Sequence, residues 1–468
     1  MNQIPLRSAT GNRHQADVPQ PQRGAHHDAI PANGGVLSGA QCPQILWCPQ
    51  ILGLGAATPR WSATDQQALE FAKRRSCTDA SQHRTVDVLY RRTGIQNRGS
   101  VLLRMGEGSD LPQQDFYPEI TGENDGGPST RARMQRYAAE APGLAITAAK
   151  RAMENAAAKA DQISHLVTVS CTGFSAPGFD IDLIEKLHLP GDVQRVQVGF
   201  MGCHGAINGL RVADAIARAD PDARVLLCSV ELCSLHYQYG YDPDRIVSGA
   251  LFADGAAAMV IGGQHQNPID GEHQHPTQRW AGKVAPHSPG KVAHDAFKER
   301  SNAALRIVKT GSRWIPESRD AMTWKIADHG FEMTLSAQVP DLIRQRLPAF
   351  IDDFLAGTGL GPSENDNSGT GGTRDGNPGN GHLQDSCRGI GGWAVHPGGP
   401  RILDAVQSGL QLPASALQIS REVLREHGNM SSATMPILLR KFQDRSIPTP
   451  WLMLGFGPGL EIEAALIA

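Results

Sequence analysis

The chain has 468 residues, of which 40% are hydrophobic, and a formal net charge of -3. This length suits one large two-part unit or about two to three average domains, and the composition can bury a sizeable core. The near-neutral balance excludes the basic surface of a nucleic-acid-binding domain, and no apolar run approaches the roughly 18 residues of a membrane-spanning helix.

The eight cysteines are spread along the chain without a CxxC pair. Their spacing indicates neither a zinc site nor a disulfide framework, so we expect no metal and a reducing, cytoplasmic compartment. The N-terminus lacks the apolar segment of a signal peptide.

The first predicted elements follow a low-complexity start. Residues 1–43 are rich in Gln, His, Pro, Gly and Asn, which predicts a disordered extension. A strand is predicted over 44–54, ending in a turn at Gly53-Leu54-Gly55. A dinucleotide-binding loop is a weaker interpretation of these glycines, because the third glycine of GxGxxG is missing.

The rest of the N-terminal half, which we place at 44–263, alternates strands and helices. A polar stretch over 105–130 predicts a surface loop, and the later alternation predicts a largely buried sheet covered by helices. The expected helices are 134–157, 179–187 and 203–218, and the expected strands are 163–170, 193–198, 224–229 and 256–261.

The C-terminal half, 281–468, repeats this alternation after a His/Gln/Pro-rich insert at 264–280. Residues 358–388 are rich in Gly, Asn, Asp and Ser, which predicts a flexible insertion that the core tolerates. The expected helices are 335–355, 400–409, one leading to His427, and 432–442, and the expected strands are 391–395, 450–454 and 460–466.

A candidate nucleophile stands in Gly202-Cys203-His204-Gly205, where a predicted strand gives way to a helix. Unpaired N–H groups and the positive end of the helix dipole favour a thiolate there, and the glycines allow a thioester to approach closely. The pattern predicts a nucleophilic Cys203, with a buried structural cysteine as the common alternative.

Two polar residues of the C-terminal half can assist this cysteine. His396 ends an apolar strand before a Pro-Gly-Gly turn, from where an imidazole can hold a cysteine as a thiolate–imidazolium pair. Asn429 precedes a predicted helix and could simply be its N-cap. In company with Cys203 and His396, its amide becomes a candidate donor to an oxyanion.

These three motifs, in this order, resemble the Cys-His-Asn constellation of the type III polyketide synthases, the chalcone and stilbene synthase superfamily. HPGGP at His396–Pro400 is intact, and Leu251–Ala258 is similar to a family segment. The family's GFGPG loop is also intact, as Gly455-Phe456-Gly457-Pro458-Gly459. The resemblance covers about 45–468 outside the inserts and implies an α/β fold, the duplicated thiolase α-β-α-β-α five-layered sandwich, and a homodimer.

The resemblance also implies a reaction. Cys203 would take an acyl group from acyl-CoA, and His396 would keep it ionised. His396 and Asn429 would bind the thioester carbonyl of malonyl-CoA and stabilise the enolate left by decarboxylation, which then attacks the acyl-cysteine. Coenzyme A would enter only in these thioester substrates, with no cofactor.

The family's gatekeepers and coenzyme A contacts are implied by position. Phe252 resembles one gatekeeper, with core packing as the alternative. Met333 falls at the second, although the neighbouring Phe331 makes this alignment uncertain. Arg92 best matches the basic coenzyme A contacts, or is a solvated surface charge.

The cavity-lining positions of the family fall at Cys171, Ala176, Cys233 and His236. A flexible Met333 and a small Ala176 predict an aliphatic acyl starter of medium to long chain. The alternative is that His236 and Cys233 leave a small cavity for acetyl or malonyl starters.

Two other functions stay open. One is a ketoacyl synthase III-like enzyme that makes a single condensation, although that group lacks GFGPG and usually has a His-Gln-Ala-Asn stretch in place of HPGGP. The other is a catalytically silent thiolase-fold protein that binds acyl-CoA, against which the intact trio argues.

Overall fold

The computed structural model describes residues 48–468 with gaps at 107, 109–110, 123, 264–304, 359, 361–386 and 388. The predicted extension at 1–43 and insert at 264–280 lie outside the described residues, as does 358–388 except for Thr358, Leu360 and Cys387. Residues from Trp47 onward form one compact unit, which is described below.

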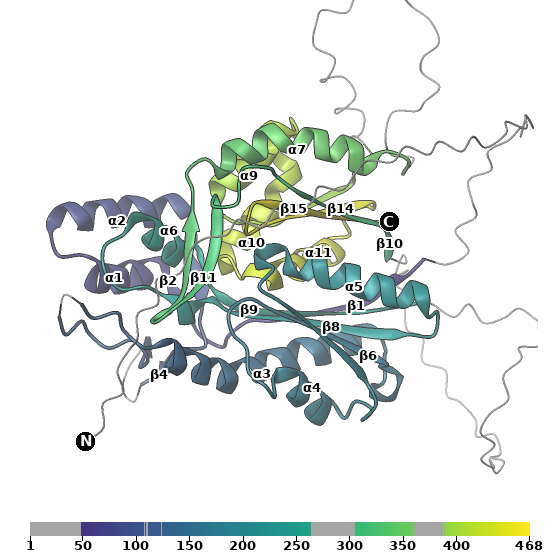
Figure 1. The fold of residues 1–468 in the computed structure, drawn as a ribbon, viewed down its shortest axis with the longest axis horizontal. Coiled ribbons are helices and arrows are strands. Elements are labelled where there is room, and N and C mark those ends of the chain that lie inside the picture. Colours follow the sequence, from purple (N-terminus) through teal and green to yellow (C-terminus); the bar gives the residue numbers. More distant parts are fainter. Residues whose placement is uncertain are drawn as a thin grey trace, which may run out of the picture. The chain divides into compact units, whose positions relative to one another are not determined.

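A mixed nine-stranded sheet runs through the unit in the order β13-β14-β15-β10-β1-β9-β8-β6-β7 (Figure 1). Two half-sheets meet where β1 (Gln50–Ala57) pairs antiparallel with β10 (Leu305–Trp314). The first half adds β6 (His165–Ser170), β7 (Gln194–Gly199), β8 (Arg224–Leu232) and β9 (Asp254–Gly262). The second adds β13 (Gly392–Val395), β14 (Trp451–Gly457) and β15 (Glu461–Ile467).

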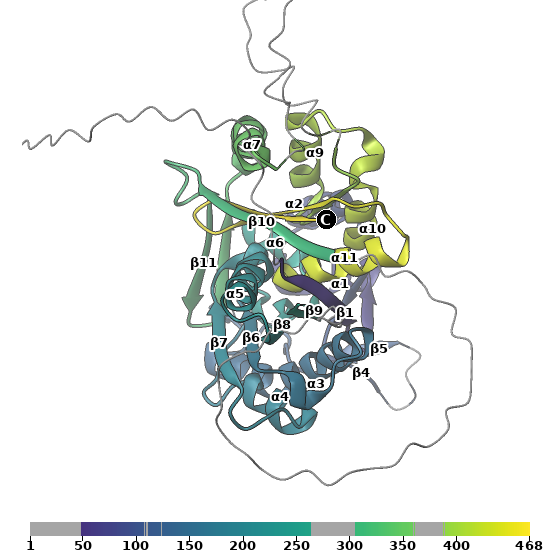
Figure 2. The same cartoon turned by 90° about the vertical axis from the view of Figure 1, so that its right-hand side faces the viewer.

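Helices occupy three layers around the half-sheets (Figures 1 and 2). Between them lie α5 (Gly205–Ala219) and α11 (Thr434–Asp444), whose apolar side chains share one core with strands of both halves. The outer face of the first half is covered by α3 (Thr130–Asn155) and α4 (Phe179–Leu187). The outer face of the second is covered by α7 (Val339–Leu355) and α9 (Pro400–Gly409). The α-β-α-β-α sandwich implied by the resemblance is confirmed.

Gly53 and Gly55 allow β1 to pack closely on a helix, and they do not form the predicted turn. β1 runs through Gly53 and Gly55 without interruption. A Cβ atom would lie 2.4 Å from the Ala152 oxygen at Gly53 and 2.2 Å from the Ala148 oxygen at Gly55. Glycine therefore lets β1 and the alanine-rich α3 approach closely. This packing accounts for the Gly53-Leu54-Gly55 pattern, so a dinucleotide-binding loop is not needed to explain it.

Several elements that the sequence pattern did not predict cap one end of the sandwich (Figure 1). They are short or largely polar, so hydrophobic periodicity is weak in them. The helices are α1 (Asp65–Ser76), α2 (Ala80–Thr93) and α6 (Pro243–Leu251). The strands are β2 (Ser62–Thr64), β3 (Asn97–Gly99), β4 (Leu103–Met105), β5 (Pro112–Gln114), β11 (Met322–Ala327) and β12 (Gly330–Leu335). The predicted loop at 105–130 is thus interrupted by β5.

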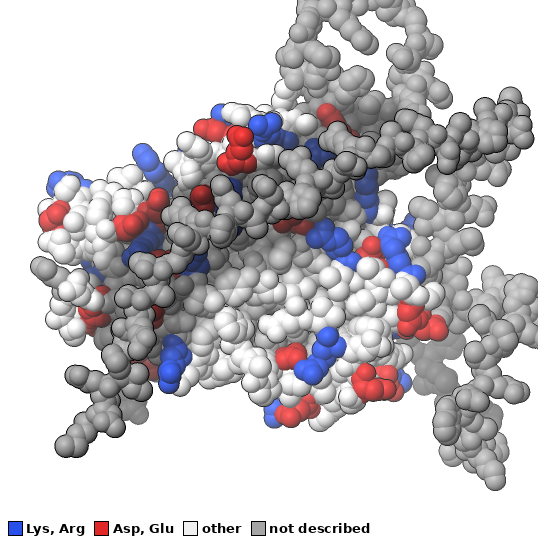
Figure 3. All heavy atoms as spheres, in the orientation of Figure 1, with Lys and Arg blue, Asp and Glu red and all other residues white. Residues whose placement is uncertain are grey.

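Strand β7 forms an outer edge of the sheet, and its six residues are exposed or partly exposed. Val196 on this strand is 41% exposed, and the nearby Phe174 and Phe200 are 49% and 37% exposed. The face toward the viewer in Figure 3 has few charged side chains across its middle.

None of the described helices is both long and apolar enough to cross a membrane.

The described residues that flank the predicted insertion lie together. A Cβ atom on Gly389 would be 3.0 Å from Cδ2 of Leu360. Replacing Asn365–Gly381 with a short Gly/Ser linker should therefore leave activity nearly unchanged and shift the free energy of unfolding by less than about 1 kcal/mol. Denaturant unfolding and turnover of the shortened chain test this, and a large loss of either would show that the segment supports the fold or the site.

Candidate active site

Cys203 lies in the turn that joins β7 to α5. The turn includes η2 (Gly202–His204), and Phe200 and Gly202 adopt positive φ angles of 58° and 70°. A Cβ atom on Gly202 would lie 2.3 Å from Cδ of Pro458. Glycine is needed at 202 because the nucleophile turn packs directly on the GFGPG loop, and Cys203 stays partly accessible.

His396 follows β13 and is held through its backbone. Its N–H donates to the Leu454 oxygen at 2.8 Å, and its oxygen accepts from the Gly398 N–H at 2.9 Å. The side chain is 1% exposed, and neither ring nitrogen has a hydrogen-bond partner among the described residues. The Asn429 side chain acts on this ring, although not at the geometry of a normal hydrogen bond.

The backbone of Asn429 forms a parallel β-bridge with that of Phe252, which holds Asn429 beside the predicted gatekeeper. Its Oδ1 accepts from the Ser431 N–H at 2.8 Å, in the turn before α11. The side-chain oxygen of Asn429 thus takes the capping role considered from sequence, and its Nδ2 can still donate a hydrogen bond to another group. The side chain interacts with both Cys203 and His396, so the structure brings the three residues together.

Burial controls the protonation of this trio. It raises the pKa of the Cys203 thiol to about 12, against opposing contacts from Ser431 and Asn429. Burial also lowers the pKa of the His396 imidazole to about 3, with His204 lowering it further and Asn429 opposing. Desolvation therefore penalises a charge on either group, and the ion pair expected from the sequence stays a prediction.

Glu231, which the sequence analysis did not single out, lies beside the trio at 0% exposure. It accepts from the Cys171 N–H at 3.0 Å, the Thr172 hydroxyl at 2.8 Å and the Ser432 hydroxyl. Burial raises the pKa of this carboxyl to about 7. Its only sequence signal is a carboxylate inside the apolar strand β8.

Cys203 opens into a pocket of about 30 Å³, close to the volume of one water molecule. Its lining includes five residues predicted to bind substrate or line the cavity: Cys171, Cys233, Phe252, Met333 and Pro458. Cys171 Sγ accepts from the Gly202 N–H at 2.9 Å, so this sulfur also supports the nucleophile turn.

Trp324 also lines this pocket, although the sequence analysis did not identify it. It pairs across the β11–β12 hairpin with Met333 and donates from Nε1 to the Cys171 oxygen at 2.7 Å. Its ring lies 6.4 Å from that of Phe252, measured between centroids. Met333 lines the pocket, whereas the neighbouring Phe331 does not, and the gatekeeper role of Met333 stays a prediction.

His236 is a buried structural residue. Its Nε2 contacts the Thr172 oxygen at 2.7 Å, and its Nδ1 accepts from the Phe331 N–H at 2.9 Å. These two bonds place the ring proton on Nε2. The ring stacks on Phe331 at 4.3 Å and borders a second, larger cavity.

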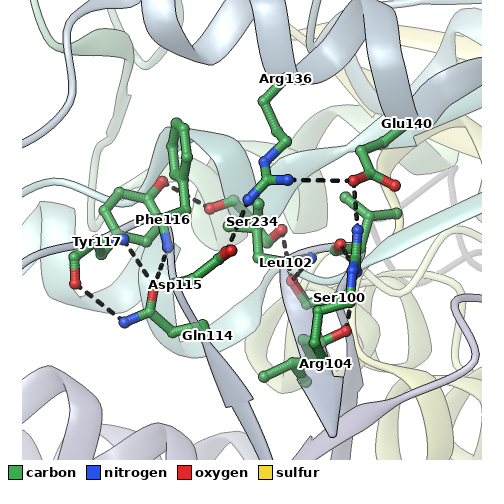
Figure 4. Close-up of polar contacts among 12 residues, drawn as sticks. Ser100, Leu102, Arg104, Gln114, Asp115, Phe116, Tyr117, Arg136, Glu140 and Ser234 are labelled. Carbon is green, nitrogen blue, oxygen red and sulfur yellow. Dashed lines mark hydrogen bonds and ion pairs between the residues drawn. The ribbon is translucent and has the colours of Figure 1, made fainter. Parts of the chain in front are cut away.

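This second cavity has a volume of about 620 Å³ and adjoins the first, with Cys233, Phe252 and Trp324 lining both. Its lining combines apolar and aromatic residues such as Phe71, Leu102 and Tyr117 with polar and charged ones such as Arg74 and Glu119. Figure 4 shows one wall, where the Tyr117 hydroxyl donates to the Ser234 oxygen at 2.8 Å. Arg136 braces the β4–β5 hairpin there through Asp115 at 2.7 Å.

Six predicted site residues line neither cavity: Ala176, Arg92, Gly455, Phe456, Gly457 and Gly459. Beyond Gly173, which packs on the ring of Tyr137, the loop after β6 reaches the surface and leaves Ala176 exposed. Arg92 is exposed in the last turn of α2. Gly455 and Gly457 pack against His204 behind the nucleophile, while Phe456 is buried in the outer core and Gly459 accepts from Ser318.

Two family models match the chain. Residues 47–265 match the N-terminal domain of chalcone and stilbene synthases, and residues 391–468 match the C-terminal domain. Type III polyketide synthase C of Arabidopsis thaliana is 28% identical over 89% of this chain and 94% of its own. The 1,3,6,8-tetrahydroxynaphthalene synthase of Streptomyces peucetius subsp. caesius is 32% identical over 69% and 72%.

Solved structures show the same fold. PKS-I of the brown alga Ectocarpus siliculosus is similar with a TM-score of 0.71 and 27% identity, over 90% of this chain and 98% of its own. A mutant of CsyB complexed with CoA-SH has a TM-score of 0.68 at 23% identity, over 90% and 100%. The family matches and the Cys-His-Asn geometry agree. The chain therefore belongs to the chalcone and stilbene synthase family, the type III polyketide synthases, and is an acyltransferase.

Proposed function

We propose that Cys203, His396 and Asn429 carry out the condensing chemistry of this synthase. Members of the family use acyl-CoA and malonyl-CoA. His396 takes the proton of Cys203 as the thiol attacks the acyl thioester and passes it to the leaving coenzyme A sulfur. The single observation that carries this proposal is that the Asn429 side chain contacts both of the others.

The same two assistants suit the decarboxylation of malonyl-CoA. Loss of carbon dioxide leaves an enolate whose negative charge needs donors in a dry site. Asn429 Nδ2, freed by the bond between its Oδ1 and Ser431, can supply one, and His396 a second. The enolate carbon then attacks the acyl-Cys203 carbonyl, and the chemistry needs coenzyme A only as substrate, with no further cofactor.

The larger cavity supports an aliphatic acyl starter. The pocket at Cys203 has the volume of one water, so a growing chain needs other space. The adjoining cavity of about 620 Å³ lies within the usual range of small-molecule sites, and each buried methylene gains about 0.8 kcal/mol against apolar walls. Access to it requires movement of Trp324 or Phe252, because both residues line the junction.

A homodimer is proposed from the β7 edge. An unpaired strand edge with exposed Val196 is a template for pairing with a second chain, and a two-fold axis would bring β7 against itself. Phe174 and Phe200 would extend the contact.

The cytoplasmic location expected from the cysteine pattern remains a prediction. The seven described cysteines are free.

Substitutions in the trio should distinguish loading of the acyl group from decarboxylation of malonyl-CoA. Cys203→Ala should abolish the acyl adduct that mass spectrometry maps to this residue. His396→Ala should impair both steps. Asn429→Ala should spare loading and slow decarboxylation by about 10²–10³-fold, the usual cost of a lost oxyanion donor. Native decarboxylation in Asn429→Ala would leave only the capping role. Wild-type protein that neither loads nor decarboxylates would be a silent acyl-CoA-binding member.

Trp324 should limit the length of the starter. Trp324→Ala joins the two cavities and should raise kcat/KM for lauroyl-CoA relative to acetyl-CoA by about tenfold, the scale of one apolar pocket contact. Trp324→Phe is the matched control, because it keeps the aromatic wall and loses only the bond to Cys171. A wild-type preference for acetyl, malonyl or coumaroyl starters, or an unchanged ranking in Trp324→Ala, would refute the aliphatic proposal.

The β7 edge should hold the dimer. Val196→Glu would bring two like charges together at the two-fold axis, so light scattering should show a shift from dimer to monomer. Val88→Glu is the control, since Val88 is similarly exposed, at 45%, but lies on α2. A dimer that persists in Val196→Glu at micromolar concentration places the interface elsewhere.

A further inference from the structure

The side chain of Arg133 on α3 is a fully buried cation without an acidic partner. It is 0% exposed, and no ion pair joins it to a carboxylate that the structure describes. Two other arginines are nearly as buried, and each faces an acid: Arg75 lies 3.6 Å from Glu119, and Arg98 lies 3.2 Å from Asp65. A buried guanidinium is costly unless hydrogen bonds compensate its charge, so neutral oxygen atoms must do so at Arg133.

These oxygen atoms come from segments that lie far apart in the chain. Nε donates to the Pro128 oxygen at 2.8 Å, just before α3 begins. Nη1 contacts the Leu235 oxygen at 2.6 Å, the Tyr237 oxygen at 2.8 Å and the Tyr117 hydroxyl at 3.1 Å. The two carbonyl groups flank His236, and His236, Tyr237 and Tyr117 all line the larger cavity. The guanidinium therefore holds a strip of cavity wall at 235–237.

Arg133 also supports the turn of the β11–β12 hairpin. A Cβ atom on Gly330, which has a φ of 103°, would lie 2.9 Å from Cδ of Arg133 and 3.0 Å from its Nε. The first turn of α3 fixes the same hairpin turn, because Thr130 donates from its N–H to the Asp328 oxygen at 2.7 Å and accepts at its hydroxyl from the Gly330 N–H at 2.8 Å. The hairpin and the wall at 235–237 thus meet at one side chain.

The hairpin carries side chains of both cavities. Trp324 and Met333 pair across it and line the smaller pocket, and Trp324 also lines the larger cavity. The Phe331 N–H donates to Nδ1 of His236 at 2.9 Å, which adds a second link between hairpin and wall. A planar guanidinium can hold several acceptors in fixed directions, which a single amine cannot do. The position of Trp324 relative to the wall therefore depends on Arg133.

We propose that Arg133 is a positioning residue that determines which lengths of acyl chain the synthase accepts. By holding the hairpin against the wall, it keeps Trp324 where the two cavities adjoin. A hairpin that is held less tightly lets Trp324 move aside, so a longer chain gains space. The loop and turn beside the trio are held by Glu231, away from these contacts. This inference rests on the proposed use of the larger cavity by the acyl starter.

Arg133→Lys tests the proposal in the full-length protein, because lysine keeps the charge but replaces the planar group by one nitrogen. The measurements are kcat/KM for lauroyl-CoA and for acetyl-CoA, and the decarboxylation of malonyl-CoA. The ratio of lauroyl to acetyl should rise about fivefold, less than for removal of Trp324 itself, while decarboxylation stays within about twofold of wild type. Arg151→Lys is the matched control with an unchanged ratio, since Arg151 lies on the same helix and donates to the Ala56 oxygen of β1.

A double-mutant cycle separates positioning from mere support of the fold. Once Trp324→Ala has removed the side chain that Arg133 positions, adding Arg133→Lys should change the ratio by less than about twofold. Effects that multiply, or equal losses for both starters and for decarboxylation in Arg133→Lys, would overturn the proposal.

Thr130→Val provides a second test should Arg133→Lys fail to fold, because it loosens the same hairpin turn without touching the buried charge. It should raise the ratio in the same direction, and a native ratio would overturn the proposal. A wild-type preference for acetyl-CoA would refute the aliphatic starter alone, since the change of the ratio from wild type to variant still tests Arg133.

Discussion

The geometry of the site depends on one buried carboxyl. Glu231 joins the loop after β6 to the turn after Asn429, through Cys171, Thr172 and Ser432. A carboxyl without solvent costs free energy unless its hydrogen bonds are satisfied, so displacement of either segment would leave an unsatisfied acceptor. These segments lie about two hundred and sixty positions apart in the chain, and the network gives them a fixed separation around the nucleophile.

Burial affects the electrostatics of the trio as well as those of Glu231. It opposes a charge on Cys203 and on His396, so a charge that forms there during the proposed reaction needs hydrogen-bond donors or an opposite charge close by. In the same medium, a hydrogen bond from Asn429 to the proposed enolate would be stronger than it would be in water.

The two cavities depend on a different part of the fold. Trp324 belongs to a two-stranded hairpin outside the main sheet, and it lines both the small pocket at Cys203 and the larger cavity. Its indole bond to Cys171 joins this wall to the same loop that Glu231 holds. The trio thus stands at the ends of elements of the two half-sheets, whereas the space proposed for the acyl chain is shaped by a hairpin and by the elements that cap one end of the sandwich.

The sequence by itself identified the family, the layered fold and the three residues that the structure brings together, because Cys203, His396 and Asn429 stand in motifs at strand and helix ends and buried strands such as β8 are largely apolar. It did not reveal Glu231 or Trp324, whose importance comes from contacts with residues distant in the chain. Nor could it show that Ala176 is exposed or that burial opposes a charge on Cys203 and on His396. Exposure and pKa depend on how much of the whole fold surrounds a group, and only tertiary packing determines that.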